Sequence, residues 1–113
     1  MKLKEIVEKL QLKVLTAQDK LDTNVTGGYT SDLLSDVIAN SKEGNLWITL
    51  QIHQNIIAVA KLKDLAGIII VNNREPDEET LKKAEEEHVP LMISEGMAFS
   101  ISGKLYKLIG TDD

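Results

Sequence analysis

The hydrophobic positions along the chain predict strands that alternate with helices. Apolar residues at positions 3, 6, 7 and 10 follow the i, i+3, i+4, i+7 spacing of a short amphipathic helix. Short apolar and β-branched runs predict strands at residues 12–15, 46–50, 66–71 and 91–93, and a brief β-prone pair stands at residues 25–26. Further helices are predicted between residues 33 and 44 and at residues 56–64, 77–88 and 98–109.

The run at residues 66–71 is apolar at nearly every position, which is typical of a strand covered on both faces of a parallel sheet. Strands that alternate with helices favour an α/β fold. We therefore expect a single α/β domain over residues 1–113, with a mostly parallel sheet flanked by helices. The helix that follows the glycine pair is expected to bury Leu33, Leu34, Val37 and Ile38.

The helix at residues 77–88 carries few apolar positions, so we expect it to lie largely in solvent. Only Leu81 and Ala84 are expected to face inward, and the acidic run 85–87 is interpreted as a solvated face. Gly103 stands inside the last helix, where glycine costs about 1 kcal/mol against alanine unless close packing requires it.

Composition limits the possible partners. The 113 residues are 42% hydrophobic and 27% charged, which suits one soluble domain with one core. Its 18 acidic residues outnumber 13 basic residues, and the net charge of -5 argues against nucleic-acid binding. No apolar run is long enough for a membrane span and no signal peptide is visible, so we expect a cytoplasmic protein.

The sequence offers little for metal or cofactor chemistry. Cysteine is absent and the two histidines, His53 and His88, stand far apart, so we predict no metal site and no cofactor. No P-loop or dinucleotide fingerprint is present, and no nucleophile is paired with a base, so we predict no catalytic residues.

A ligand of an open α/β sheet binds beyond the carboxyl ends of the strands. Four predicted loops qualify, at residues 27–32, 51–55, 72–75 and 94–96. In the first, Gly27 and Gly28 would let the backbone approach an anion, and Thr26, Thr30 and Ser31 would add hydroxyl groups. The alternative is a tight turn followed by a helix N-cap.

Four further residues could complete this site, two of them in the same loop. Tyr29 could stack on a planar ligand, or it could belong to the core or to an interface. Asp32 could share a cation with Asp36, four residues on, but a capping role is the stronger interpretation.

His53 and Arg74 follow later strands. His53 could donate to a ligand or act as a base, and the alternative is a solvated side chain. Arg74 could clamp an anion, and the alternative is a surface ion pair with Glu75 or Asp77.

The runs 26–40, 43–49 and 74–79, together with His53, resemble a stand-alone DRTGG domain over nearly the whole chain. Thr26, Gly27 and Gly28 match the last three residues of the name-giving motif, whereas Asn24 and Val25 stand where the family has Asp and Arg. The resemblance implies a fold similar to the N-terminal domain of HPr kinase and to domains of bacterial phosphotransacetylases and CBS-domain pyrophosphatases.

In those bacterial, cytoplasmic proteins the domain is an accessory, regulatory or dimer-forming unit. Three hypotheses follow. The first is a non-catalytic regulatory domain that binds a small anionic metabolite or nucleotide at Gly27 and Gly28, with Arg74 and His53 nearby. The second is an interaction module that forms a homodimer and docks a larger enzyme, since apolar residues crowd the runs 56–60 and 98–109. The third is a phosphotransferase that uses His53 as a base.

Overall fold

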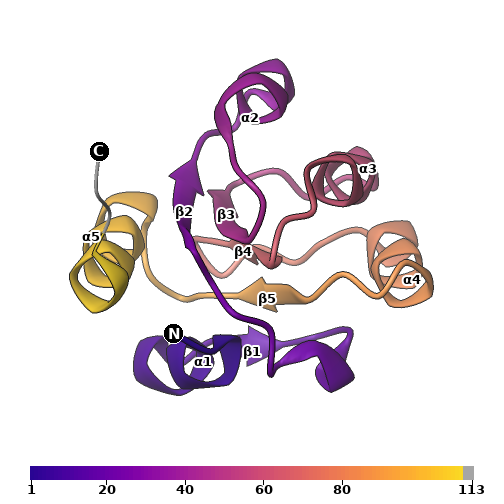
Figure 1. Ribbon diagram of the computed structural model, residues 1–113. Coiled ribbons are helices and arrows are strands. Elements are labelled where there is room, and N and C mark those ends of the chain that lie inside the picture. The colour runs from indigo at the N-terminus through magenta and orange to yellow at the C-terminus, as the bar shows by residue number, and fades with distance from the viewer. Residues whose placement is uncertain (111–113) are drawn as a thin grey trace.

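The computed structural model describes residues 1–110 and shows a five-stranded sheet in the order β1-β5-β4-β3-β2 (Figure 1). The strands are β1 Lys13–Val14, β2 Gly27–Thr30, β3 Asn45–Thr49, β4 Gly67–Ile70 and β5 Leu91–Ile93. Strands β2 to β5 are parallel, and β1 pairs antiparallel with β5.

Helices cover both faces of the sheet. They are α1 Leu3–Leu10, α2 Leu34–Asn40, α3 Asn55–Lys63, α4 Glu78–Glu86 and α5 Ala98–Ile109. Helices α1 and α5 lie on one face, and α2, α3 and α4 lie on the other (Figure 1). The predicted α/β fold with a mostly parallel sheet is confirmed.

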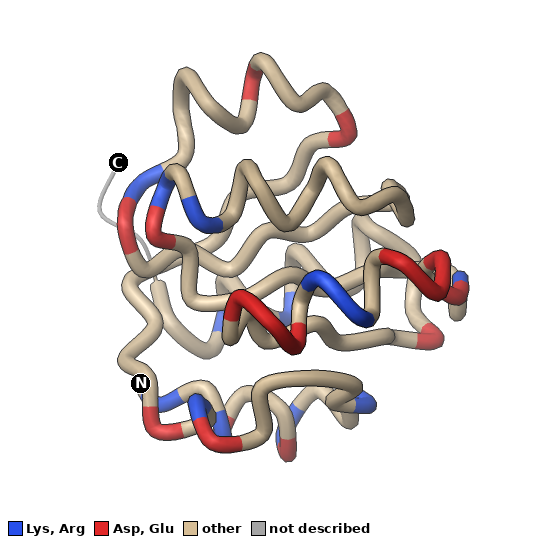
Figure 2. Tube along the Cα trace, turned by 90° about the vertical axis from the view of Figure 1, so that its right-hand side faces the viewer, with Lys and Arg blue, Asp and Glu red and all other residues tan. Residues whose placement is uncertain are grey.

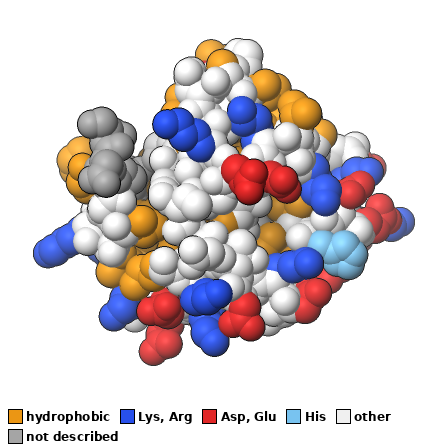
Figure 3. Space-filling model, in the orientation of Figure 1, with side chains coloured by type: hydrophobic (Ala, Val, Ile, Leu, Met, Phe, Trp, Pro, Cys, Tyr) orange, Lys and Arg blue, Asp and Glu red, His pale blue; other side chains and the backbone are white. Residues whose placement is uncertain are grey.

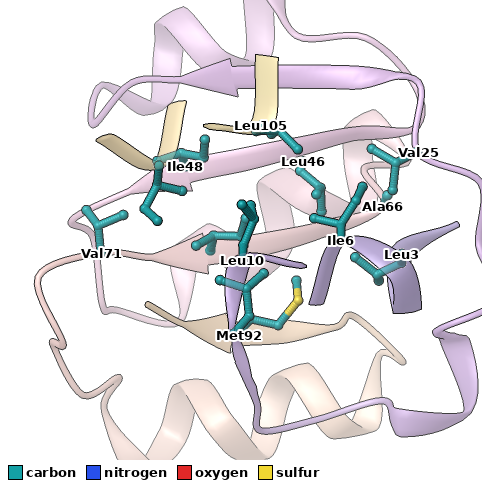
Figure 4. Packing of buried hydrophobic residues seen from close by; sticks show 13 residues of the cluster. Leu3, Ile6, Leu10, Val25, Leu46, Ile48, Ala66, Val71, Met92 and Leu105 are labelled. Carbon is teal, nitrogen blue, oxygen red and sulfur yellow. The ribbon is translucent and has the colours of Figure 1, made fainter. Parts of the chain in front are cut away.

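Strand β4 divides the hydrophobic core between the two faces. Ile69 belongs to the cluster beneath α1 and α5, whose side chains converge on the sheet in Figure 4. Ile68 and Ile70 belong to the cluster beneath α2, α3 and α4. All three isoleucines are fully buried, which explains why the sequence of this strand is apolar without interruption.

The apolar run 56–60 serves this second cluster. Ile56, Ile57, Val59 and Ala60 are buried on α3 within the chain, so this run gives no support for an interface. Among the described residues, no helix is long and apolar enough to cross a bilayer.

Two expectations near the glycine pair are wrong. Gly27 and Gly28 form the first half of β2 rather than a loop, because they pair in parallel register with β3. The buried face of α2 is also narrower than predicted, since Val37 is its only buried residue, while Leu33 is 65% and Ile38 39% exposed. This seven-residue helix lies beside the edge strand, where only one of its sides meets the sheet (Figure 1).

Helix α4 is anchored by more than the two predicted residues. Thr80 and Ala84 are buried and Leu81 is half-buried, and the Thr80 hydroxyl donates to the Ile52 carbonyl at 2.7 Å. Figure 2 shows acidic and basic residues along this helix. Glu85 is not only solvated, because its carboxylate accepts a bond from the Ala17 amide at 3.3 Å.

Two glycines provide a matched test of the packing. Apart from its own turn of helix, no described atom lies within 4 Å of a Cβ built on Gly103, whereas one built on Gly67 would stand 2.9 Å from the Pro90 carbonyl oxygen. We expect Gly103→Ala to raise the free energy of unfolding by about 0.5–1 kcal/mol through helix propensity. Gly67→Ala should lower it by about 1–3 kcal/mol through overpacking. Urea denaturation in dilute solution checks both, and equal effects would contradict this account.

Candidate functional site

Strand β2 forms the open edge of the sheet, and its residues point alternately to the two faces. A Cβ on Gly28 would lie 2.8 Å from a methyl group of Leu105, so the glycine permits close packing of α5. The hydroxyl oxygens of Thr30 and Ser102 lie 2.7 Å apart on the same face. Tyr29 points to the opposite face, toward α2.

Two adjoining grooves run along this edge. The α5 groove, of about 320 Å³, lies between β2 and α5 and is lined by Thr30, Ser102 and Tyr106 among others. The Lys42 groove, of about 590 Å³, lies between β2 and the segment after α2, and Thr26, Gly27, Lys42 and Asn45 line it. Gly28, Tyr29 and Ile109 border both grooves, so all five residues from Thr26 to Thr30 line one continuous edge.

The Thr26 hydroxyl braces the turn that precedes β3. It donates to the Glu43 carbonyl at 2.8 Å and accepts from the Asn45 side-chain amide at 3.2 Å. Gly44 in this turn has φ +82° and leaves no room for a Cβ against Thr26. Thr26 therefore shapes the wall of the Lys42 groove, with its hydroxyl already engaged in two bonds.

Tyr29 ties the edge strand to α2. Its ring packs against the second core cluster, and its hydroxyl donates to the Asp36 carboxylate at 2.8 Å. The Asn40 side-chain amide donates to the same carboxylate oxygen at 2.9 Å. The Tyr29 ring is half-buried and fixed, which favours the expected core role over stacking on a planar ligand.

This hydrogen bond shifts the pKa values of both partners. The bond from Tyr29, followed by those from Asn40 and Ser31, holds the pKa of Asp36 below its ordinary value of 3.8. The same bond, with burial and the charge of Asp36, raises the pKa of Tyr29 above 10.0.

The pH dependence of stability follows from these two directions. Asp36 contributes stability above its unfolded pKa that is lost as pH falls through its lower folded pKa. Tyr29 contributes stability below pH 10.0 that is lost as pH rises through its higher folded pKa. We therefore expect the stability difference between the wild type and Tyr29→Phe to be constant near neutral pH and to shrink at both extremes.

Urea unfolding followed by the fluorescence of Trp47, the single and fully buried tryptophan, measures this difference. Tyr106→Phe, which alters an exposed tyrosine, serves as the control. A Tyr29→Phe profile parallel to that of the wild type at all pH values would contradict the assignment.

Ser31 and Asp32 stand at the carboxyl end of β2 and fix the loop that follows β3. One Asp32 carboxylate oxygen accepts from the Thr49 hydroxyl at 2.8 Å and from the Leu50 amide at 2.7 Å. The Ser31 carbonyl accepts from the Trp47 indole at 2.8 Å. Asp32 is therefore neither the N-cap of α2 nor on one helix face with Asp36, because the helix begins at Leu34.

Arg74 and His53 hold the same loop from the other side. The Arg74 guanidinium donates to the Leu50 carbonyl, and its predicted ion pair with Glu75 or Asp77 is absent among the described residues. His53 Nδ1 lies 2.6 Å from an Asp77 carboxylate oxygen and its side chain is 66% exposed. Arg74 thus braces backbone at the carboxyl end of the sheet, and His53 joins the same loop to the Asp77 side chain just before α4.

Seven of the nine predicted residues divide into two groups, and Tyr29 and Thr30 lie between them on β2. Thr26, Gly27 and Gly28 stand at the amino end of β2, while Ser31, Asp32, His53 and Arg74 stand at the carboxyl end. The strand rises about 3.3 Å per residue, so Gly27 and Thr30 are separated by about 10 Å. The expectation that Arg74 and His53 lie near the glycine pair is wrong, because the glycines are in the strand and not in the loop that follows it.

The sequence reasoning missed Lys42, Asn45, Ser102 and Tyr106. Lys42 and Asn45 reach the groove because Gly27 pairs with Asn45 in the parallel register of β2 and β3. Pairing the predicted strand that contains Thr26 with the strand that follows it would have placed the residues just before β3 beside Thr26. Ser102 and Tyr106 depend on the docking of α5, for which the sequence carries no local signal.

The Lys42 groove combines an exposed ammonium group with the open edge of a strand. An edge strand presents unpaired backbone groups to solvent. Among the described residues that line this groove, Lys42 is the only basic one and Glu43 is the only acidic one. Such an arrangement suits a small anion. Within residues 1–110, no three His, Asp or Glu side chains gather in a way that could hold a metal ion.

Comparisons with known proteins give a structural match alone. No protein-family model and no curated protein matches the sequence. Among solved structures, the chain is similar to the CBS and DRTGG domains of the regulatory region of a Clostridium perfringens pyrophosphatase, with a TM-score of 0.72 and 13% identity. The fold is similar to that of a DRTGG domain. The match covers 92% of this chain and 45% of the other, so the chain spans less than half of that protein's length.

The chain carries only the last three residues of the DRTGG motif, Thr26, Gly27 and Gly28. Val25 stands where the family has Arg, and its side chain is 3% exposed in the cluster beneath α1 and α5. Asn24 stands where the family has Asp and is exposed beside Lys2. This chain therefore has no charged side chain at these two positions, and the charged residues that line the groove beside the glycines are Lys42 and Glu43.

The role of Asp32 as a brace can be tested by its removal. In Asp32→Ala, the hydroxyl of Thr49, a residue that is only 1% exposed, and the Leu50 amide both lose their acceptor. We expect the free energy of unfolding to fall by about 1–3 kcal/mol. Asp22→Ala, which removes only a surface pair with Lys4, should cost about 0–1 kcal/mol. Equal losses in urea denaturation would contradict the bracing role.

Proposed function

We propose that the chain is a non-catalytic regulatory domain that binds a small anionic ligand, a nucleotide or a phosphorylated metabolite, in the Lys42 groove. The observation that carries this proposal is the placement of Thr26, Gly27, Gly28 and Tyr29 along an open groove beside Lys42. A lysine ammonium is a compact cation with three donors, and Gly28 is exposed, so that the backbone there is accessible to a phosphate or carboxylate, while Gly27 is buried.

The structural neighbour supports a regulatory role. Its regulatory region is complexed with an activator, diadenosine tetraphosphate, and belongs to a larger enzyme. By analogy of fold, we propose that this chain is a DRTGG domain and that it acts on a larger enzyme as its partner.

The proposed site is smaller than the nine residues expected from the sequence. Thr26, Gly27, Gly28 and Tyr29 remain, with Lys42 added, and Thr30 borders the adjoining α5 groove. Ser31, Asp32, His53 and Arg74 are assigned to the brace at the carboxyl end. The position of His53, bonded to Asp77 and remote from the glycines, supports a domain without phosphotransferase activity.

A second role, pairing with another copy of the chain, is supported by the exposed apolar side chains of α5. Phe99 is 93% and Tyr106 57% exposed. Large apolar side chains that are exposed together mark interaction sites more often than isolated ones do.

Ligand binding can be tested by thermal unfolding and calorimetry with AMP, ADP, ATP, diadenosine tetraphosphate and inorganic phosphate. A ligand at 100 times its Kd adds about 2.7 kcal/mol to the stability of the folded state. For a domain of this size, that raises Tm by about 10–20 °C. We expect at least one compound of the panel to produce such a shift.

Two variants with the same change in net charge locate the site. Lys42→Ala should weaken binding about tenfold or more, because a charge-assisted hydrogen bond is lost. Lys13→Ala, at the opposite edge of the sheet on β1, should leave the Kd unchanged. A panel without any shift, or equal losses in the two variants, would refute the proposed site.

A further inference from the structure

Helix α5 exposes the largest apolar side chains of the described chain along a single stripe. Phe99, Gly103 and Tyr106 follow the i, i+4, i+7 spacing of one helix face, and we call them the α5 stripe. Phe99 is 93% exposed, Tyr106 is 57% exposed, and Met97 just before the helix is 62% exposed. Figure 3 shows hydrophobic and basic side chains over α5 at the left of the molecule.

Gly103 makes a gap between the two aromatic side chains. No described atom lies within 4 Å of the place where its Cβ would be, so packing within the chain does not call for glycine. Glycine is nevertheless unfavourable inside a helix. Close approach of another backbone is the physical reason for a helical glycine that fits this position.

We propose that α5 pairs with α5 of a second copy of the chain, antiparallel across a two-fold axis that passes near Gly103. This inference rests on the pairing role within the proposed function and assigns a surface to it. A two-fold interface places the same patch on both copies, so the patch must be complementary to itself. The α5 stripe meets this requirement, because each copy contributes both a projecting Phe99 and a gap at Gly103.

The α5 groove gives the projecting ring a place to lie. In an antiparallel pair centred on Gly103, Phe99 of one copy stands level with Lys107 of the other, within reach of Tyr106 on the same stripe. Tyr106 and Ile109 line the α5 groove, whose volume is about 320 Å³. The lysine stem can cover the aromatic ring, and its ammonium can interact with the ring face.

The charge distribution favours a second copy on this face. Helix α5 carries Lys104 and Lys107 and no acidic residue, although the chain has 18 acidic residues and a net charge of -5. Two negatively charged chains repel less across a helix whose own residues carry no carboxylate. Lys104 lies about 100° around the helix from Gly103 and therefore off the α5 stripe. The two copies of Lys107 would be separated by eight residues of helix, about 12 Å at 1.5 Å per residue. That separation exceeds the screening length of about 10 Å at 0.1 M salt.

The size of the surface predicts a weak dimer. Phe99 and Tyr106 from two copies are four aromatic side chains, and each can bury at most about 150–250 Å². The resulting total of about 600–1,000 Å² lies below the range of about 1,200–2,000 Å² for stable interfaces. Association should therefore depend on concentration, with a Kd in the micromolar range or weaker.

Sedimentation velocity of the full chain over about 5–500 μM tests this inference. We expect the wild type to pass from monomer to dimer over this range. Phe99→Ser, which removes the projection, and Gly103→Gln, which fills the gap with a better helix former, should both remain monomeric. Leu62→Ser, which removes a 68% exposed apolar side chain from α3, should dimerise like the wild type.

The outcomes separate this inference from ligand binding. A wild type that remains monomeric at every concentration, a Phe99→Ser variant that still dimerises, or equal effects of Phe99→Ser and Leu62→Ser would overturn the α5 interface. Thermal unfolding of each variant in dilute solution confirms that it is folded, and Gly103→Gln is expected to match or exceed the Tm of the wild type. Phe99→Ser should retain any ligand affinity that depends on Lys42. The ligand site at Lys42 and the α5 interface can therefore be refuted independently of each other.

Discussion

Strand β4 must be removed from water on both faces at once, and the remaining elements are arranged around this requirement. Ile68 and Ile70 face one set of helices and Ile69 faces the other, and each fully buried side chain contributes about 1.5–3 kcal/mol. A strand buried on both faces needs neighbours on both sides, which β3 and β5 provide. The three-layer arrangement follows, with α1 and α5 on one face and α2, α3 and α4 on the other.

The same arrangement decides where the sheet ends. Strand β1 occupies one edge through antiparallel pairing with β5, and β2 occupies the other edge with β3 as its only partner in the described chain. The Thr-Gly-Gly-Tyr-Thr run thus gains an unpaired edge and two grooves without forming a loop. Its accessibility comes from the position of β2 in the sheet, whereas the carboxyl-end loops use Asp32 and Arg74 to brace one another.

Elements with strong periodicity could be predicted from the sequence, and residues whose roles depend on pairing could not. The helix at Leu3–Leu10 and the strand around Ile69 are defined by local hydrophobic patterns that the tertiary structure keeps. Gly27 and Gly28 have a local preference for turns, but pairing with β3 and the close approach of Leu105 to Gly28 prevail. Lys42 entered the candidate site only through strand register, which the prediction of separate elements does not supply.

Helix α2 is attached to the rest of the molecule more by hydrogen bonds than by buried area. Val37 is its only buried residue, and the bond between Tyr29 and Asp36 joins it to β2. Elements with few buried apolar contacts open at a small fraction of the free energy of global unfolding. We therefore expect α2 to open at a lower free energy than the sheet. Because its last residue, Asn40, borders the Lys42 groove, a ligand there would be coupled to the opening of a whole helix.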